Sequence, residues 1–517
     1  VVYSGGYFAD PARRPAALAG LLAFLAAMQG LVLADGYLTL LVFWELVGAL
    51  SARLIAFNRE DPAAAPAAVR AFLTTRAADA GLYVALLALY AGAGTLAFGA
   101  DRPEGVLGAL VGLGLVLAAI GKSAQAPLQT WLTAAMAGPT PVSALLHSAT
   151  MVAAGVYLLM RSDALLAGWP LEVAGWIGAL TAVAGAAIAL AQTDLKRVLA
   201  GSTTSQLGLM FVGVAAGGPA VALFHLVAHA AGKATMFLAA GIFGHERGGT
   251  GLEDLRGAGR DDRRTFAAFA IGALSIAAVP PFAAFFSKDV IVAAAEEHPA
   301  WLVLVLVAAA GSAAYLLRPA LVLWGEPSDA RVRVPALRGR RVMLAATGTL
   351  AAASVALGVL GDPLRTLLDA PELPSSLLSV ALSAVAVAAG VVVVLRRVRV
   401  PARLAAAAED QLHVDTALRA IAQRPALASA AALARLDDGV VDRIVDDAGR
   451  ATLVLARSQR WVEARGVDAA VDGLARLVGR AGAQSPRLQT GRLHEYLRDT
   501  VLGAAAVVAL ITLAAVL

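Results

Sequence analysis

The sequence predicts an all-α membrane protein that crosses the bilayer many times. Of its 517 residues, 59% are hydrophobic and only 15% are charged, and the mean hydropathy is +0.73. These values lie far from the balance of a soluble globular domain. Apolar runs of about 20 residues, the length that a helix needs to cross a bilayer, recur along the chain. Because these runs are long and rich in Leu, Ala and Gly, they exclude a membrane β-barrel.

Thirteen segments are predicted to span the membrane. They lie at 16–33, 37–57, 68–95, 105–126, 142–160, 172–191, 203–216, 218–243, 265–283, 299–324, 341–360, 375–396 and 498–517. The chain begins at Val1 without a signal-peptide pattern, and we expect that N-terminal helices precede the part given by this sequence. The predicted organisation has four parts: a core at 1–325, additional membrane helices at 326–397, a lateral region at 398–497 and an anchor at 498–517.

The stretch from 400 to 497 differs from the rest because it is charged and rich in Arg and Asp. Apolar residues between Val440 and Ala448 recur at helical spacing, with acidic and basic residues between them, which is typical of an amphipathic helix. No proline occurs at 426–485, so one helix there would reach roughly 75–90 Å and must lie along a surface. The alternative is a set of shorter helices that are broken at glycines, namely Gly449, Gly466 or Gly473.

Charge and cysteine content exclude several classes of function. The net charge is +5, but the arginines cluster in short loops and in the C-terminal third, which does not indicate nucleic-acid binding. The absence of cysteine excludes disulfides, thiolate metal sites and iron–sulfur ligation by this chain. If the chain belongs to a redox enzyme, the redox centres therefore sit on other subunits.

Lysine is rare in this chain, and its positions are informative. Of the 42 Lys and Arg residues only four are lysine, so 38 are arginine. The four are Lys122, Lys196, Lys233 and Lys288. A codon bias towards arginine explains the shortage of lysine but not the places where lysine is kept. Arginine stays charged at any working pH, whereas a buried lysine can titrate. Lysine kept in apolar segments therefore predicts proton transfer there.

Lys122 ends an apolar run, and no Asp, Glu, Lys or Arg follows it until after Met160. His147 is the one side chain in this interval that titrates near neutrality. Pro127 removes a backbone hydrogen bond to the carbonyl of Ser123, as in the broken helices of transporters. We interpret Lys122 and His147 as proton carriers. The alternative for Lys122 is a helix-end lysine that reaches the lipid headgroups.

His225, His229 and Lys233 form a second cluster. Their spacing of four places them on one helical face, each about 6 Å along the axis from the next. From Val198 to Gly244 nothing else is charged. Two histidines four apart can bind zinc, but the glutamate of the zinc-protease motif and a third ligand are missing. Core histidines with interhelical hydrogen bonds remain an alternative to the favoured interpretation, a proton relay.

Lys288 and Asp289 follow Pro280 and Pro281, which remove donors to the carbonyls of Ile276 and Ala277 and predict another interrupted span. We interpret the two charged residues as part of the route. The alternative is an ion pair at the membrane edge.

Acidic residues occur early in the chain. Glu45 lies inside a span without a basic neighbour on its own helix, so its predicted partner is Lys122. Arg76 and Asp79 are three residues apart and can pair with each other. A structural role is as plausible as a functional one for those two. For the charged turn at 194–197 the structural role is favoured.

Several strings resemble a known family. They are WELVG, GKSAQAPLQTWLTAAMAGPTPVSALLHSATMVAAGVYL, TDLKRVLAGSTTSQLGLM, FHLVAHAAGKATMFLAAG and PPFAAFFSKD. They are similar to the antiporter-like proton-translocating subunits of complex I and of Mrp antiporters. The resemblance implies two inverted five-helix repeats, each with a broken helix. It also implies that Glu45 pairs with Lys122, that His147 bridges to Lys233, and that Lys288 leads to the exit.

The C-terminal part resembles the L-subunit branch of complex I. The predicted lateral helix, the string LQTGRLHEYLRD and one final span carry this resemblance. That branch usually has sixteen spans, so about three N-terminal helices are expected to be missing. The resemblance implies a bacterial cytoplasmic membrane and, as partners, other membrane-arm subunits of the antiporter-like M and N types and the J and K types. FMN, iron–sulfur clusters and quinone would belong to the whole complex, and no cofactor or metal to this chain.

Three rival functions remain open. One is an Mrp-type Na⁺/H⁺ antiporter subunit, which usually carries further membrane helices in place of a lateral helix. Another is the membrane subunit of an ion-coupled hydrogenase or of an inorganic-carbon uptake complex. The third is a structural membrane scaffold, against which the confinement of lysine to the core argues.

Overall fold

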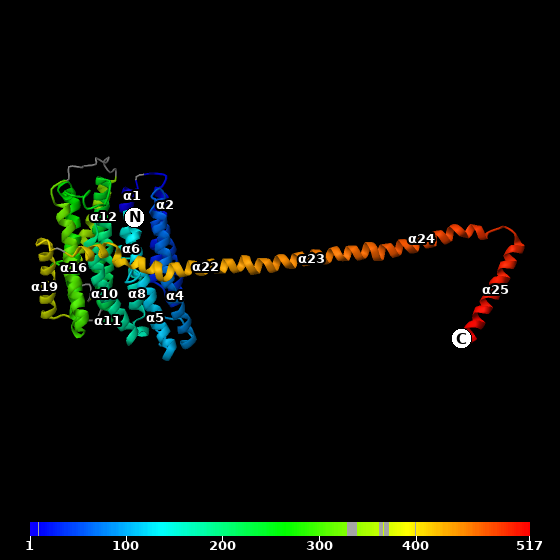
Figure 1. The fold of residues 1–517 in the computed structure, drawn as a ribbon. Coiled ribbons are helices and arrows are strands. Elements are labelled where there is room, and N and C mark those ends of the chain that lie inside the picture. Colours follow the sequence, from blue (N-terminus) through cyan, green and yellow to red (C-terminus); the bar gives the residue numbers. More distant parts are fainter. Residues whose placement is uncertain (9, 328–338, 361–365, 367–371, 399, 517) are drawn as a thin grey trace. The chain divides into compact units, whose positions relative to one another are not determined.

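The computed structural model describes residues 1–8, 10–327, 339–360, 366, 372–398 and 400–516. These residues form two units, Val1–Ala417 and Leu418–Leu517. The first unit is a bundle of helices that run side by side, and the second is dominated by one long helix (Figure 1). The four-part division predicted from the sequence stays a prediction.

Twelve helical segments of the described residues are long and apolar enough to cross a membrane, which agrees with the predicted all-α polytopic class. They are α2 (Arg14–Val32), α3 (Tyr37–Ile55), α4 (Ala64–Ala93), α5 (Gly105–Lys122), the pair α7–α8 (Thr140–Arg161), α10 (Trp169–Ala191), α11 (Leu195–Gly217), α12 (Pro219–Arg247), α16 (Pro299–Leu323), α17 (Arg340–Val359), α19 (Leu377–Leu395) and α25 (Leu493–Val516). The remaining predicted span, 265–283, covers most of α14 (Arg263–Ile276) and the break after it, and ends at the first residue of α15 (Ala283–Ala294).

Helix α11 lies at the centre of the first unit, and 94% of its most hydrophobic 18-residue stretch is buried. It packs closely on α10 through glycine, because a Cβ on Gly208 would lie only 2.5 Å from the carbonyl oxygen of Gly178. Small residues at such contacts let membrane helices approach each other. The polar side chains of α11 therefore face protein rather than lipid.

Three interruptions free backbone carbonyls inside the first unit. Helix α5 ends at Lys122, and the freed carbonyl of Ser123 accepts from Gln125 Nε2 at 2.8 Å. Helix α14 ends at Ile276, whose carbonyl accepts from Lys288 Nζ at 2.6 Å. Both breaks were predicted from the prolines that follow them. The third, between α7 (Thr140–Ser148) and α8 (Ala153–Arg161), contains no proline and was not predicted.

A left-handed turn follows helix α20 (Ala402–Glu409). Gln411, Leu412 and His413 have φ values of 56°, 61° and 57°, which side chains other than glycine rarely adopt. Each such residue costs roughly 1–2 kcal/mol, so the turn persists only where its surroundings hold it. Two contacts stabilise the turn. Arg70 forms an ion pair with Asp415, and Gln192 Nε2 donates to the carbonyl of Glu409 at 3.1 Å.

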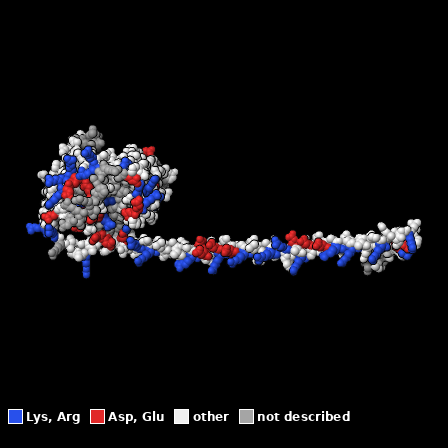
Figure 2. Space-filling model, turned by 90° about the horizontal axis from the view of Figure 1, so that it is seen from above, with Lys and Arg blue, Asp and Glu red and all other residues white. Residues whose placement is uncertain are grey.

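The second unit contains the amphipathic helix predicted for 426–485. Helix runs without a break from α22 (Arg424–Leu436) through α23 (Asp442–Val462) to α24 (Asp468–Gln484), so the alternative of separate helices is wrong. Basic and acidic side chains occur in short groups along it (Figure 2). None of the residues described in these three helices is buried within the chain.

Short π-helical turns interrupt this helix at Arg419–Gln423, Asp437–Val441 and Glu463–Val467. Before the last of them an apolar stripe recurs every three or four residues up to Val462, and after it the stripe resumes at Val467. That step of five residues is one too many for an α-helical turn and would rotate the later stripe by about 100°. A π-turn accommodates one extra residue. It therefore keeps Val441, Val462, Val471 and Val478 on one face.

Deleting Arg465 from the last π-turn is expected to leave the apolar stripe in line, because a regular α-helix absorbs the loss. Deleting Arg457 from α23 also removes an exposed arginine but turns every later residue by about 100°. We expect the first deletion to assemble into its membrane complex like the unaltered chain and the second to assemble poorly. Native gels of detergent-solubilised membranes measure this. Equal assembly of the two deletions would show that the stripe contacts nothing.

Candidate functional site

The four lysines are all buried in the first unit. Lys122 and Lys233 are 0% exposed, Lys288 is 2% and Lys196 is 8%. Ionisable groups at such depth are costly unless they are paired or hydrogen-bonded. The partners of each lysine therefore decide what it can do.

Lys122 pairs with Asp79. Its Nζ donates to Asp79 Oδ2 at 3.2 Å, and the other carboxylate oxygen accepts from Trp44 Nε1 at 2.6 Å. The amine also lies 4.9 Å from the centre of a Trp44 ring, in a cation–π contact. Gly48, one turn after Trp44 on α3, leaves the room for it, because a Cβ there would lie 3.2 Å from Nζ.

Neither of the two pairs predicted from the sequence, Glu45 with Lys122 and Arg76 with Asp79, forms a direct ion pair among the described residues. Glu45 instead forms an ion pair with Arg76 and accepts from Tyr83 Oη at 2.6 Å. The reason is that α4 turns Arg76 towards its half-exposed side and Asp79 towards the core. Spacing along one helix could not reveal which of the two faces α5.

His147 lies in the last turn of α7, next to the unpredicted break, and is fully buried. Neither of its ring nitrogens has a hydrogen-bond partner among the described residues. Its ring centre lies 6.1 Å from that of Trp131, whose Nε1 donates to the carbonyl of Gly121, next to Lys122. Trp131 thus neighbours both His147 and the end of α5.

The second cluster occupies one face of α12, as the spacing predicted. His229 Nδ1 lies 2.9 Å from the carbonyl oxygen of Ser148, so this nitrogen carries a hydrogen and the neutral ring keeps Nε2 as an acceptor. That Nε2 is buried and has no partner among the described residues. Lys233 Nζ donates to Ser202 Oγ at 2.6 Å and to the carbonyl oxygen of Leu199 at 3.2 Å. No ion pair to Lys233 occurs in the described part of the chain.

A series of polar side chains continues from Lys233 towards Lys288. Tyr315 Oη interacts with Ser202 and accepts from Gln206 Nε2 at 2.9 Å. His225 Nε2 lies 3.1 Å from Gln206 Oε1, and its Nδ1 lies 2.9 Å from Ser287 Oγ. Ser287 directly precedes Lys288. The serines, Gln206 and Tyr315 were missed from the sequence because they carry no charge, although the run from Ser202 to Gln206 is unusually polar for a membrane helix.

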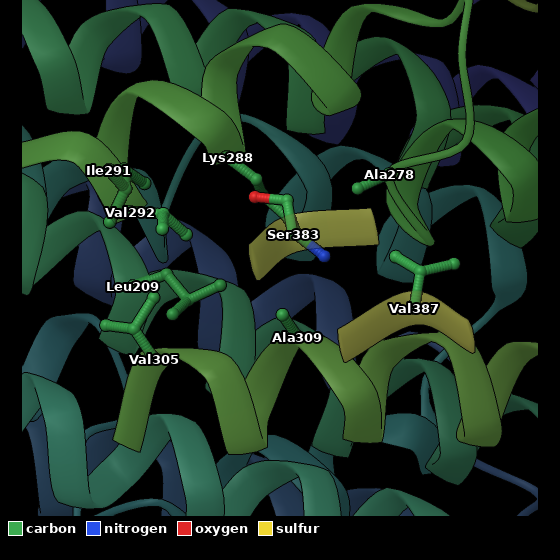
Figure 3. Close-up of a pocket in the computed structure, with 9 residues that line it drawn as sticks. All are labelled: Leu209, Ala278, Lys288, Ile291, Val292, Val305, Ala309, Ser383 and Val387. Carbon is green, nitrogen blue, oxygen red and sulfur yellow. The ribbon is translucent and has the colours of Figure 1, made fainter. Parts of the chain in front are cut away.

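Lys288 and Asp289 do not pair with each other. Lys288 Nζ donates to Ser312 Oγ at 2.7 Å as well as to the carbonyl of Ile276, and Asp289 Oδ1 accepts from Ser383 Oγ at 3.3 Å. The alternative of a membrane-edge ion pair is therefore wrong. A cavity of about 10 Å³, room for about one water molecule, lies between Lys288 and Ser383 and is otherwise lined by apolar residues (Figure 3).

Lys196 has the structural contacts favoured for its turn. Its Nζ donates to the carbonyl oxygens of Met136 at 2.6 Å and Gly138 at 2.7 Å, at the end of the 3-10 turn Ala135–Ala137. Asp194 caps the start of α11 by accepting from the backbone of Arg197. Within the described residues no three His, Asp or Glu side chains come together as a metal site.

Buried lysines and histidines on interrupted membrane helices define a class of protein that carries ions across a bilayer through titratable side chains. The family model described as "NADH:quinone oxidoreductase/Mrp antiporter, TM" matches residues 34–312. Subunit L of the NADH-quinone oxidoreductase of Mycobacterium tuberculosis is 36% identical over 549 residues, which cover 98% of this chain and 82% of that relative. The chain belongs to the NADH:quinone oxidoreductase/Mrp antiporter family.

Solved structures agree with this assignment. The Mrp complex of Dietzia sp. contains a chain with a TM-score of 0.64 and 27% identity, covering 95% of this chain and 51% of that one. Respiratory complex I of Thermus thermophilus contains a chain with a TM-score of 0.57 and 28% identity, covering 66% of this chain and 77% of that one.

Proposed function

We propose that this chain is a proton-translocating membrane subunit of an NADH:quinone oxidoreductase. The observation that carries the proposal is the series of buried polar side chains from Lys233 through Ser202, Tyr315, Gln206 and His225 to Ser287. Lys233 and Lys288 are held by neutral hydroxyl and carbonyl groups. Each can therefore lose its proton without leaving a buried carboxylate unpaired.

The proposed route has three stages. Lys122 exchanges its proton under the control of Asp79, because separating a buried lysine from its carboxylate favours release. His147 and the free Nε2 of His229 accept and pass protons towards Lys233. Protons then leave through His225 to Lys288, with Asp289 beyond it.

The bundle has a marked charge asymmetry that orients it. Connections and helix ends on the side of the α3–α4 loop carry Arg59, Arg197, Arg256, Arg260 and Arg397, among other arginines. The opposite connections carry Arg102 between α4 and α5 and Arg161 at the end of α8. Since basic loops stay on the cytoplasmic side, we infer that the α3–α4 side faces the cytoplasm of a bacterial membrane.

The partners follow from the second unit and from the relatives. A helix about 100 Å long (67 residues from Leu418 to Gln484) exposes its apolar stripe throughout. We propose that other membrane-arm subunits cover this stripe. FMN, iron–sulfur clusters and quinone belong to the other subunits of the proposed complex.

The test is to purify the complex that contains this chain and to reconstitute it in vesicles. We expect flavin and iron–sulfur absorbance in the preparation. Proton movement should begin when NADH and quinone are added to the vesicles. An Mrp-type antiporter, favoured by the structural similarity to the Dietzia complex, would lack both chromophores and would move protons only against a Na⁺ gradient.

A further inference from the structure

A chamber of about 590 Å³ lies at the end of the bundle inferred to face the cytoplasm. It is bounded by the start of α4, the helix α6 (Thr130–Ala134), the α10–α11 turn and the segment 409–415. All of these belong to the first unit. No residue of the route described above lines it.

The charged side chains that line the chamber are mainly acidic. Two of its lining residues are basic, Arg70 and Arg197, and five are acidic, namely Asp61, Asp194, Glu409, Asp410 and Asp415. The lining therefore has a formal charge of 2 − 5 = −3. A concave surface of one sign focuses the field and raises the local concentration of counter-ions, here cations.

Three buried glutamines lead inward from the chamber. Gln411 lines it and is 8% exposed, yet its Nε2 has no partner among the described residues. Gln129 Nε2 donates to the carbonyl of Gln411 at 3.4 Å, while its own Oε1 is unpartnered. Gln125, on the same loop after Lys122, also keeps an unpartnered Oε1. Buried amide groups of this kind normally bind water.

We propose that this chamber is the cytoplasmic entrance for protons and that Gln411, Gln129 and Gln125 connect it to Lys122. The proposal rests on the proposed function, because it names the entry point of that same route. The turn at 411–413 holds Gln411 over the passage. This turn is held in place by the Arg70–Asp415 ion pair and by the bond from Gln192 to Glu409, so access depends on the segment from which the long helix starts.

A cysteine placed in the chamber tests the proposal in the assembled complex. The chain has no cysteine of its own, so Thr133→Cys, on the chamber wall, introduces its single thiol. Ala97→Cys, exposed in the opposite α4–α5 connection, is the control. We expect thiosulfonate reagents added to inverted vesicles to modify Thr133→Cys, with the trimethylammonium reagent reacting about tenfold faster than the sulfonate reagent. Modification should then stop most of the proton pumping.

Complete modification without loss of pumping, or no reaction from the cytoplasmic side, overturns the proposal. So does an equal loss in Ala97→Cys vesicles. Lys233→Arg is assayed in parallel to separate this result from the proposed function. If Lys233→Arg loses pumping while the modified Thr133→Cys complex pumps normally, the entrance is wrong and the function stands. If neither change affects pumping, both the proposed entrance and the proposed function are wrong.

Substitution of the glutamine itself gives a second, independent measurement. Gln411→Leu keeps the size of the side chain but removes its hydrogen-bonding atoms. We expect it to lower the pumping rate severalfold in assembled complex, while Gln423→Leu, at an exposed glutamine of the next π-turn, has no effect. Equal pumping by the two variants would remove Gln411 from the passage.

Discussion

Lys233→Ala and Lys233→Arg are both expected to lose proton pumping in assembled complex, by at least about tenfold. Lys233 is fully buried, and its hydrogen-bond partners among the described residues, Ser202 and the carbonyl of Leu199, are uncharged. Alanine removes the carrier. Arginine keeps the positive charge but cannot release its proton. The measurement is the number of protons moved per electron in vesicles, with assembly checked by native gel.

Lys196→Arg is the matched control for Lys233→Arg. Lys196 is also buried, but its contacts are two carbonyl oxygens that a guanidinium can satisfy. We expect Lys196→Arg to pump if it assembles. If Lys233→Arg pumps at the unaltered proton-to-electron ratio, Lys233 is not an obligatory carrier and the relay fails at its centre.

Asp79→Asn is expected to have the second largest effect. The Asp79–Lys122 pair is almost inaccessible to solvent, with side chains 2% and 0% exposed. At 3.2 Å and an effective dielectric near 20, the attraction is about 5 kcal/mol, and breaking a buried pair costs several kcal/mol. Asparagine still accepts from Trp44 but no longer stabilises the lysine cation. Lys122 should then fail to hold its proton, and pumping should fall to a small fraction.

An exposed ion pair provides the control for Asp79→Asn. Glu253 and Arg256 pair at 2.9 Å, with side chains 82% and 40% exposed, and such surface pairs contribute little. Glu253→Gln is therefore expected to pump normally. Normal pumping by Asp79→Asn as well would show that the carboxylate does not govern Lys122.

The positions of the titratable groups could be predicted from the sequence, but their partners could not. Charge inside an apolar run is visible from composition alone, which is why Lys122, Lys233 and Lys288 were found. The partner of Lys122 depends on which face α4 turns towards α5, and that is a property of packing. Asp79 and Arg76 are too close in sequence for spacing to separate them.

Two of the three helix breaks could be predicted from the sequence, and the third could not. Pro127 and the Pro280–Pro281 pair each marked an interruption, because proline removes a donor wherever it falls. The break after Ser148 has no such marker. There Thr150 Oγ1 donates to the carbonyl of Leu145, and His229 Nδ1, from α12, donates to the freed carbonyl of Ser148. An interruption that depends on a side chain from another helix leaves little trace in the local sequence.

The π-turns of the long helix imply that its length can vary in small steps. A regular helix that must present one stripe over about 100 Å can gain or lose residues only in near-whole turns. A π-turn absorbs a single residue, or about 1.5 Å of rise, without rotating the rest. Each of the three π-turns therefore lets the helix change in length by one residue while its apolar stripe stays in line. In relatives whose neighbouring subunits are spaced differently, insertions and deletions in this helix should concentrate at those turns.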